Sequence, residues 1–283
     1  MGWYPFLLYA ILIIEQKMKQ KLFVIKFLPL IACLLVFNIS CSYSHSENNA
    51  AVGASLAEGD EYLFNNELTK AQEVYELALE KDPDNHEALW RLSRCYVWQG
   101  MTAKKAKDKK KKWKKAAEYA RRGIEANPNS AESHAYVAIA VGKCALYSSG
   151  GAKVKASREI KEMAEKAIEL DPVHYKAHLA LGAWHRNVAT ASSFEKQLAK
   201  MFFGELPEAT LEESLEFLLK SINLGGDSVK NYYELALTYE AIGDYEHAKT
   251  AYKNALTAPS VYPNDIEIKE EIKNTLMSET YEK

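Results

Sequence analysis

Most of the chain carries the apolar pattern of amphipathic helices. Apolar residues recur three and four positions apart in segments such as "AQEVYELALE" at 71–80 and "EMAEKAIEL" at 162–170, so that they share one face of a helix. Leu, Ala, Glu and Lys are abundant, whereas the 283 residues include only 13 Gly and 8 Pro. Pattern and composition together predict an all-α fold.

One arrangement of small, aromatic and proline residues occurs near both ends of the helical region. The N-terminal copy carries it at Gly59, Tyr62, Ala71, Tyr75, Ala78 and Pro83. The C-terminal copy carries it at Ala236, Tyr239, Gly243, Ala248, Tyr252 and Ala255. This spacing resembles the tetratricopeptide repeat, a pair of antiparallel helices that cannot bury its apolar face alone and therefore stacks on its neighbours. We expect a right-handed superhelix.

Three further helix pairs can be placed between these two copies, which makes five units. All three are longer than the terminal copies, and we expect their extra residues in enlarged connections between the two helices of a unit. Pro follows Asp82, Asn127 and Asp171 and marks three helix ends, because its ring cannot continue a helix. The segment "IEIKEEIKNTLMSE" at 266–279 is expected to cap the stack.

The segment at 201–221 interrupts the helical pattern within the fourth unit. "TASSFEKQLAKMFF" before it predicts an extra amphipathic helix that begins at Ser192 or Ser193, and "GELPEA" ends this helix. Thr210 is then expected to cap the next helix, with Glu213 three residues later completing a capping box. We therefore interpret the segment as an elaborated hairpin rather than a domain boundary.

The N-terminal region resembles a lipoprotein signal peptide. Lys17, Lys19 and Lys21 precede an apolar run from Leu22 to Ser40, and Cys41 follows directly. We predict cleavage before Cys41 and attachment of lipid to this residue. The predicted domains are an N-terminal extension with signal peptide at 1–40, a flexible tether at 41–53 and a tetratricopeptide-like superhelical domain at 54–283.

Three alternatives remain open in this region. Cys33, at the end of "LIAC", fits the local lipidation pattern better but would leave an exposed apolar stub. Met18 begins a normal signal sequence, so that either Met1 or Met18 is the true start. The first residues could also form a genuine transmembrane helix, followed by a second one.

Four segments carry a resemblance to the regulator of microtubule dynamics family. They are "ALWRLSRCY" at 88–96, "NPNSAESHAYVAIAVG" at 127–142, "LGAWHRNVA" at 181–189 and "FFGELPEATLEESLEF" at 202–217. The resemblance implies a fold of stretched tetratricopeptide repeats without a catalytic motif, and its eukaryotic members are linked to microtubules, spindle poles and organelle membranes. The lipoprotein signal instead predicts a Gram-negative envelope. We expect anchoring in the outer membrane facing the periplasm, because Ser42 rather than an acidic residue follows the cysteine.

Two surfaces are candidates for binding a partner. The first helix of each pair should line the concave face, where aromatic and Arg side chains suit a peptide groove but also serve as ordinary filler between repeats. The groove candidates are Trp90, Arg94, Trp98, Arg186 and Tyr233. A lysine-rich insert around Trp113 is either a patch for an acidic partner or simply a solvated extension. Its lysines are Lys104, Lys105, Lys107, Lys109, Lys110, Lys111, Lys112, Lys114 and Lys115.

The remaining chemistry predicts a protein without catalytic activity. The sequence holds no Gly-rich phosphate loop, nucleophile elbow or HExxH motif, and we expect no cofactor. His134 and His178 occupy matching places in successive units, and His185 shares a face with His178, which favours packing over metal binding. The formal charge of −2 argues against nucleic acid. The expected function is a scaffold that binds a protein partner, with a microtubule regulator and a lipid-handling protein as alternatives.

Overall fold

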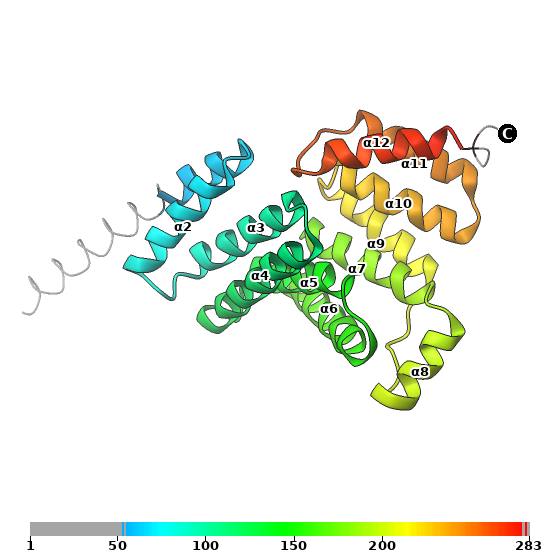
Figure 1. The fold of residues 1–283 in the computed structure, drawn as a ribbon, viewed down its shortest axis with the longest axis horizontal. Coiled ribbons are helices and arrows are strands. Elements are labelled where there is room, and N and C mark those ends of the chain that lie inside the picture. The colour runs from blue at the N-terminus through cyan, green and yellow to red at the C-terminus, as the bar shows by residue number, and fades with distance from the viewer. Residues whose placement is uncertain (1–52, 54, 279–280, 282–283) are drawn as a thin grey trace, which may run out of the picture. The chain divides into compact units, whose positions relative to one another are not determined.

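The computed structural model describes residue 53, residues 55–278 and residue 281, and Figure 1 shows their arrangement. Within these residues the chain is helical throughout, without a β-strand, as the sequence predicts. The described residues from Ser55 onward belong to one compact unit. Residues 55–64 form a helix directly before α2, and eleven labelled helices follow.

The labelled helices have the following bounds: α2 (Leu68–Lys81), α3 (His86–Thr102), α4 (Ala106–Ala126), α5 (Ala131–Ala145), α6 (Gly150–Leu170), α7 (Tyr175–Ala189), α8 (Ser193–Phe203), α9 (Leu211–Asn223), α10 (Val229–Ile242), α11 (Tyr245–Thr257) and α12 (Asp265–Leu276). The pairs α3–α4, α5–α6, α7–α9 and α10–α11 make the most extensive contacts. With the pair formed by residues 55–64 and α2, the five predicted units are confirmed. The predicted cap is confirmed too, because α12 packs on α10 and α11.

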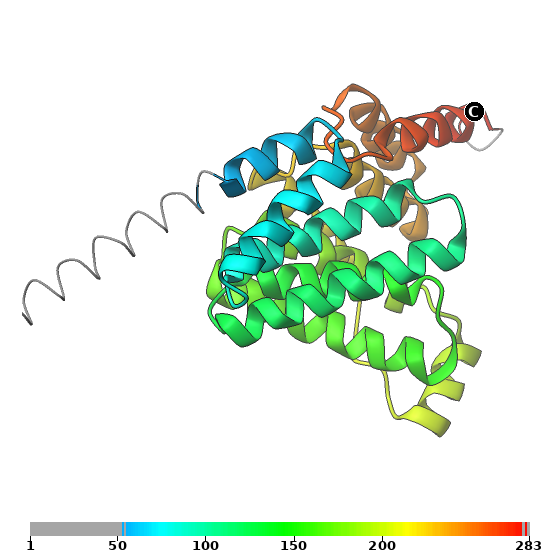
Figure 2. The same ribbon diagram turned by 60° about the vertical axis from the view of Figure 1, so that its left-hand side comes forward.

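The stacked pairs form two layers. The first helices, α3, α5, α7 and α10, contact one another in that order along one side of the stack. We call this side the inner face. The second helices, α4, α6 and α9, each pack against the first helix of the following unit, so every pair buries its apolar side against a neighbour. Figure 2 shows this succession from a second direction.

Glycine and proline act where the repeat pattern places them. A Cβ atom on Gly100 would clash with Nε1 of Trp113, so only glycine lets α3 and α4 approach this closely. At the three predicted ends, Asp82, Asn127 and Asp171 adopt extended backbone angles immediately before their prolines. The three helix ends expected from the sequence are confirmed.

The extra residues of the second and third units are located differently from the expectation. They lengthen the helices, because α4 and α6 have 21 residues each. The connections before them are short, at residues 103–105 and 146–149. From Lys107 onward the lysine-rich insert therefore belongs to the first half of a continuous helix, and Lys104 and Lys105 lie in the connection before it. Only the fourth unit has an enlarged connection, which contains α8.

The two predicted caps of the fourth unit are present, but the complete capping box forms at Ser192 and not, as predicted, at Thr210. Ser192 begins α8 with a complete capping box, in which Glu195 accepts from the backbone N–H of Ser192. Thr210 caps α9 by accepting from the backbone N–H of Glu213 at 3.1 Å. Its hydroxyl, rather than its N–H, donates to the Glu213 carboxylate at 2.9 Å.

The signal region at 1–40, nearly all of the tether at 41–53 and the predicted lipidation site Cys41 lie outside the described residues. Those boundaries stay predictions. Among the helices that the structure describes, none combines the length and the apolar character needed to cross a bilayer.

Candidate functional site

The three groove candidates of α3 are buried between repeats. Trp90, Arg94 and Trp98 expose only 7%, 7% and 4% of their surface. Trp90 stacks on Tyr136 of α5, with ring centroids 6.0 Å apart and planes inclined by 10°. Arg94 forms an ion pair with Asp60 and lies over the ring of Trp90. These side chains hold successive units together, which is the filler interpretation; a role in binding a partner stays a prediction.

The segment between α11 and α12, residues 258–264, reaches the inner face from the far end of the chain. The ring of Tyr262 packs edge-on against Trp98, with centroids 5.9 Å apart. Asp265 holds the segment in place by accepting backbone N–H bonds from Val261 and Tyr262 at 2.7 and 2.8 Å. Burial raises the pKa of Tyr262, and the nearby hydroxyls of Tyr175 and Tyr136 raise it further. The C-terminal region thus covers part of the inner face at α3.

The other two groove candidates, Arg186 and Tyr233, lie on α7 and α10. Arg186 pairs with Glu234 of α10 at 2.7 Å, and Lys230 forms a second ion pair with the same carboxylate. Burial opposes ionisation of Glu234, but Lys230 and Arg186 outweigh it and hold its pKa at about 2. Tyr233 donates a hydrogen bond to Glu271 of α12 at 2.6 Å. This half of the inner face is therefore charged, whereas the α3 half is aromatic.

Lys143, in the last turn of α5, belongs to the same charged region but was not predicted as a site residue. It is half-buried, and no described residue gives it a hydrogen bond or an ion pair. Burial and the positive charge of Lys230 lower its pKa to about 7. The carboxylate of Glu234 acts in the opposite direction. The available signal was a lone lysine in the apolar segment "AYVAIAVGKCA", where a charge has no obvious partner.

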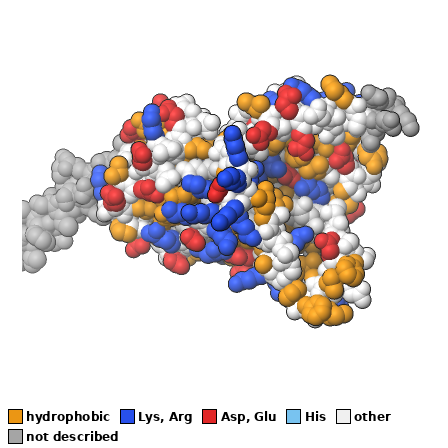
Figure 3. Space-filling view, viewed as in Figure 1, with side chains coloured by type: hydrophobic (Ala, Val, Ile, Leu, Met, Phe, Trp, Pro, Cys, Tyr) orange, Lys and Arg blue, Asp and Glu red, His pale blue; other side chains and the backbone are white. Residues whose placement is uncertain are grey.

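The lysine-rich insert forms the exposed side of α4 (Figure 3). Trp113 is the inward-facing residue of this stretch, with 4% exposure, and its indole N–H donates to Val97 O at 3.1 Å. Three lysines bond to neighbouring groups: Lys110 to Tyr147 O, Lys112 to Gln99 and Lys115 to the Tyr96 hydroxyl. No lysine from Lys104 to Lys115 forms an ion pair with a described carboxylate. We call this surface the basic face; an acidic partner for it stays a prediction.

One helix carries its apolar side outward. Phe194, Leu198, Met201 and Phe202 of α8 expose 69%, 38%, 67% and 66% of their surface, and they share a face at helical spacing. Figure 3 shows them as an orange patch over α8. The opposite side of α8 packs on α6. Arg158 of α6 stabilises the C-terminal end of α8 by donating a hydrogen bond to Phe203 O at 2.9 Å. We call the four residues the apolar patch.

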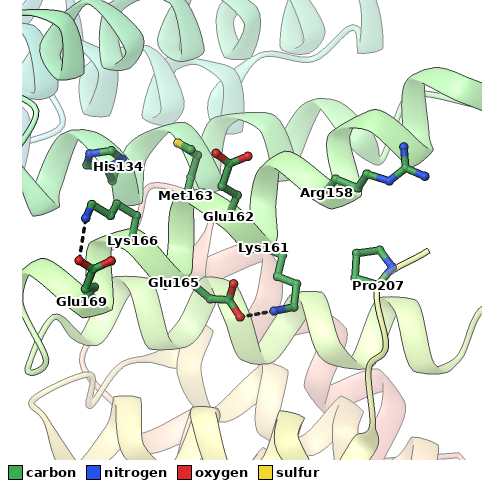
Figure 4. Close-up of a pocket in the computed structure, with 9 residues that line it drawn as sticks. All are labelled: His134, Arg158, Lys161, Glu162, Met163, Glu165, Lys166, Glu169 and Pro207. Carbon is green, nitrogen blue, oxygen red and sulfur yellow. Dashed lines mark hydrogen bonds and ion pairs between the residues drawn. The ribbon is translucent and has the colours of Figure 1, made fainter. Parts of the chain in front are cut away.

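A shallow cavity of about 550 Å³ lies along α6 (Figure 4). Four of its charged side chains form ion pairs, Lys161 with Glu165 and Lys166 with Glu169. Pro207, from the connection after α8, borders it at one end.

The histidines serve the structure, as predicted. His134 and His178 occupy matching positions, and each bonds through Nε2 at 3.0 Å to the carbonyl of the proline six residues before it. His185 lies beside Glu213, with burial lowering its pKa. In the described part of the chain, no group of three His, Cys, Asp or Glu residues could hold a metal ion.

Comparison with known sequences agrees with the repeat architecture. A sequence profile described as "Regulator of microtubule dynamics protein 1-3" matches residues 55–281. Regulator of microtubule dynamics protein 1 of Bos taurus is 31% identical over 212 residues, which cover 74% of this chain and 65% of the cattle protein. Regulator of microtubule dynamics protein 3 of Xenopus laevis is 28% identical over 211 residues, or 74% and 43% of the two chains. The chain therefore spans less than two thirds of the length of either relative.

A solved structure supports the fold. A thermophilic TPR protein of Thermus thermophilus superposes with a TM-score of 0.57 at 16% identity, covering 80% of this chain and 100% of that one. At this identity the likeness concerns the fold alone. It agrees with the helix pairs described above and confirms the tetratricopeptide-like architecture.

Proposed function

Because the chain belongs to the family of regulator of microtubule dynamics proteins 1 to 3, we propose that it is a non-catalytic scaffold that binds another protein through the inner face of its repeats. Helical repeats of this class typically serve protein interactions, because stacked units create an extended surface without needing a reactive centre. Function must still be argued from a site, since a fold alone does not define one.

The observation that carries the proposal is the charged half of the inner face. Arg186, Lys230 and Glu234 come from two successive units, α7 and α10, and meet in one cluster on rigid helices. Tyr233 adds an aromatic side chain beside them on α10. A surface assembled from several repeats, with Arg and Tyr at its centre, is typical of peptide recognition.

The test is affinity capture with the full chain as bait, followed by cross-linking and mass spectrometry. We expect a protein partner whose cross-links map to α5, α7 and α10, and whose recovery falls at least fivefold with Arg186→Ala and Tyr233→Ala together. Lys253→Ala, on the exposed side of α11, is the matched control and should leave recovery unchanged. Equal recovery with the double variant would contradict the proposal.

The basic face supports a second candidate, the regulation of microtubules that the names of the relatives describe. Seven of its nine lysines lie on one continuous helix, and none of the nine forms an ion pair with a described carboxylate, so an acidic polymer surface would complement them. Co-sedimentation of the full chain with microtubules should fall severalfold when Lys107, Lys111 and Lys114 are replaced by Gln. Binding that is absent in the unmodified chain, or insensitive to these changes, would argue against this candidate.

Anchoring to a membrane through a lipid on Cys41 is part of the same proposal. Its support is the sequence pattern of a basic start, an apolar run and a cysteine, which resembles a lipoprotein signal. The proposed location is the outer membrane of a Gram-negative envelope, with the scaffold facing the periplasm. Mass spectrometry of the mature N-terminus should find a diacylated Cys41. An intact Met1 or Met18 would exclude this anchor, and a diacylated Cys33 would move it.

A further inference from the structure

The connections inside the second, third and fourth units adjoin one another along one edge of the stack. They are residues 103–105, residues 146–149 and residues 190–210, the last of which include α8. The start of α4 meets the second connection where Lys110 donates to Tyr147 O at 2.9 Å. The start of α6 meets α8 so closely that a Cβ atom on Gly151 would lie 2.7 Å from the ring of Phe203. Figure 2 shows the three connections on the right-hand side of the stack, and we call them the connection edge.

The connection edge exposes large apolar side chains beyond the apolar patch of α8. Leu146 and Tyr147 expose 68% and 40% of their surface, and Phe203 is exposed as well. With the apolar patch, these residues make up seven of the sixteen large apolar side chains that are exposed in the described chain. Because the seven gather on adjoining segments, they form an extended apolar surface of the kind that marks an interaction site.

The same edge is strongly positive. Residues 103–111, 146–158 and 190–205 hold eleven Lys and Arg but only three Asp and Glu, whereas the whole chain has a formal charge of −2. Two of these cations, Lys153 and Lys200, pair with glutamates of the same edge. The other nine form no ion pair with a described carboxylate. The edge therefore combines exposed apolar side chains with unpaired positive charge, and Figure 3 shows both on one face of the molecule.

We propose that the connection edge docks on an anionic lipid bilayer, with Leu146, Tyr147 and the apolar patch in the interface and the lysines against the headgroup phosphates. Large apolar side chains enter the interfacial region of a bilayer, and cations beside them are attracted by its negative surface. Charge alone would also suit an acidic protein, but it would leave the apolar side chains uncovered. The inference goes beyond the scaffold function, and it does not use the anchor at Cys41, because it concerns the folded repeats alone.

The test measures binding of residues 55–283 to sucrose-loaded vesicles by sedimentation. This segment contains all five helix pairs, their core and the cap α12, and so folds on its own. One vesicle contains equal amounts of phosphatidylglycerol and phosphatidylcholine, and the other contains phosphatidylcholine alone. The edge variant combines Lys104→Gln, Lys105→Gln and Lys155→Gln. The matched control removes three exposed lysines of α2, α9 and α11 by Lys81→Gln, Lys220→Gln and Lys253→Gln.

We expect the partition coefficient of the unmodified segment to be at least tenfold higher for the mixed vesicles than for phosphatidylcholine alone. Each lysine close to an anionic surface strengthens binding about fivefold, so the edge variant should bind the mixed vesicles at least tenfold more weakly. The control variant carries the same net charge and should stay within threefold of the unmodified segment. Circular dichroism melting verifies that both variants are folded.

A fluorescence measurement tests entry into the bilayer separately. Leu146→Trp places an indole on the connection edge, whereas the four tryptophans of the described chain are buried. Lipids with brominated acyl chains quench an indole that enters the bilayer. We expect them to quench the fluorescence of the Leu146→Trp variant and to leave that of a Leu77→Trp variant, on α2, unchanged.

Equal loss of affinity in the edge variant and the control variant would overturn the proposal, since binding would then follow net charge alone. Equal binding to both vesicles, or a bound Leu146→Trp variant that is not quenched, would overturn it too. So would the absence of vesicle binding, and self-association abolished by Phe202→Ser would then assign the edge to a second copy of the chain. Capture of a partner by the inner face is tested at Arg186 and Tyr233, so the scaffold function stands or fails independently.

Discussion

The ring of Tyr262 packs edge-on against that of Trp98, with centroids 5.9 Å apart, and so joins the segment before α12 to α3. Trp98 belongs to the second unit, whereas Tyr262 follows the fifth. Repeats of this class ordinarily contact only their neighbours, so that stability is a sum of local terms. This contact adds a long-range connection, which makes the second unit and the segment after the last unit depend on each other.

Replacing Tyr262 by Ala should therefore affect a distant helix. We expect a loss of about 1–3 kcal/mol in the free energy of unfolding, because a half-buried aromatic ring is removed from an aromatic contact. Hydrogen exchange should accelerate in the C-terminal turns of α3. Val261→Ala, a change at the exposed neighbouring residue, is the control. Unchanged exchange in α3 would show that the two ends are independent.

The contact of Gly100 with Trp113 offers a test of helix spacing. Gly100→Ala would drive a methyl group into Nε1 of the indole, whose N–H donates to Val97 O at 3.1 Å. Overpacking and loss of this bond should lower the free energy of unfolding by about 1–3 kcal/mol. The matched control is Gly142→Ala in α5, where the nearest atom, Cδ1 of Ile160, is 3.8 Å away. There we expect a gain of about 0.5–1 kcal/mol from helix propensity. Denaturant unfolding measures the change in the free energy of unfolding for each variant. A change of the same sign in both variants would refute the argument that Gly100 sets the helix spacing.

The repeat pattern made the architecture predictable. Gly59, Tyr75 and the prolines after Asp82 and Asn127 define where helices touch and end, and these constraints are local in sequence. The extra residues of the middle units were misplaced for a physical reason. A lysine-rich stretch has good helix propensity and can continue a helix, but its charge pattern resembles a solvated loop.

The site was harder to predict, because it depends on contacts between distant segments. Trp98 was correctly expected on a first helix, yet nothing local to it indicates that Tyr262 covers it. Lys143 was overlooked because its distinctive property is the absence of a described partner, which requires the packing of α5, α10 and α12 to be known. Arg186 and Glu234 meet only because α7 stacks on α10.

The pKa of Lys143 gives the stability of the fold a specific pH dependence. Burial and Lys230 lower this pKa from 10.5 to about 7, so the folded protein holds the proton more weakly than the unfolded chain. The free energy of unfolding should therefore rise as pH increases from about 7 toward 10.5, and the unfavourable contribution is fully present below about 7. Lys143→Met should remove this contribution and raise the free energy of unfolding at pH 7 by about 1–3 kcal/mol. Urea unfolding at pH 7 and pH 9.5 measures it. A variant that is less stable than the unmodified chain at pH 7 would contradict the lowered pKa.

The apolar patch of α8 should bind a lipid surface without contributing to the fold. Its four side chains face solvent, whereas α8 is held to α6 from its other side, so Phe194→Ser with Phe202→Ser should change the melting temperature by less than about 2 °C. Amphipathic helices with large aromatic residues on one side bind at the membrane interface.

Flotation of a chain of residues 55–283 with anionic liposomes should accordingly depend on the patch. We expect the double variant to lose most of its lipid-bound fraction, because burial of each large apolar side chain contributes about 1.5–3 kcal/mol. Leu77→Ser, at another exposed position, on α2, should retain it. If the double variant floats as well as the unmodified chain, the patch does not bind lipid. A protein contact would then be expected to cover it, because exposed apolar patches mark interaction sites.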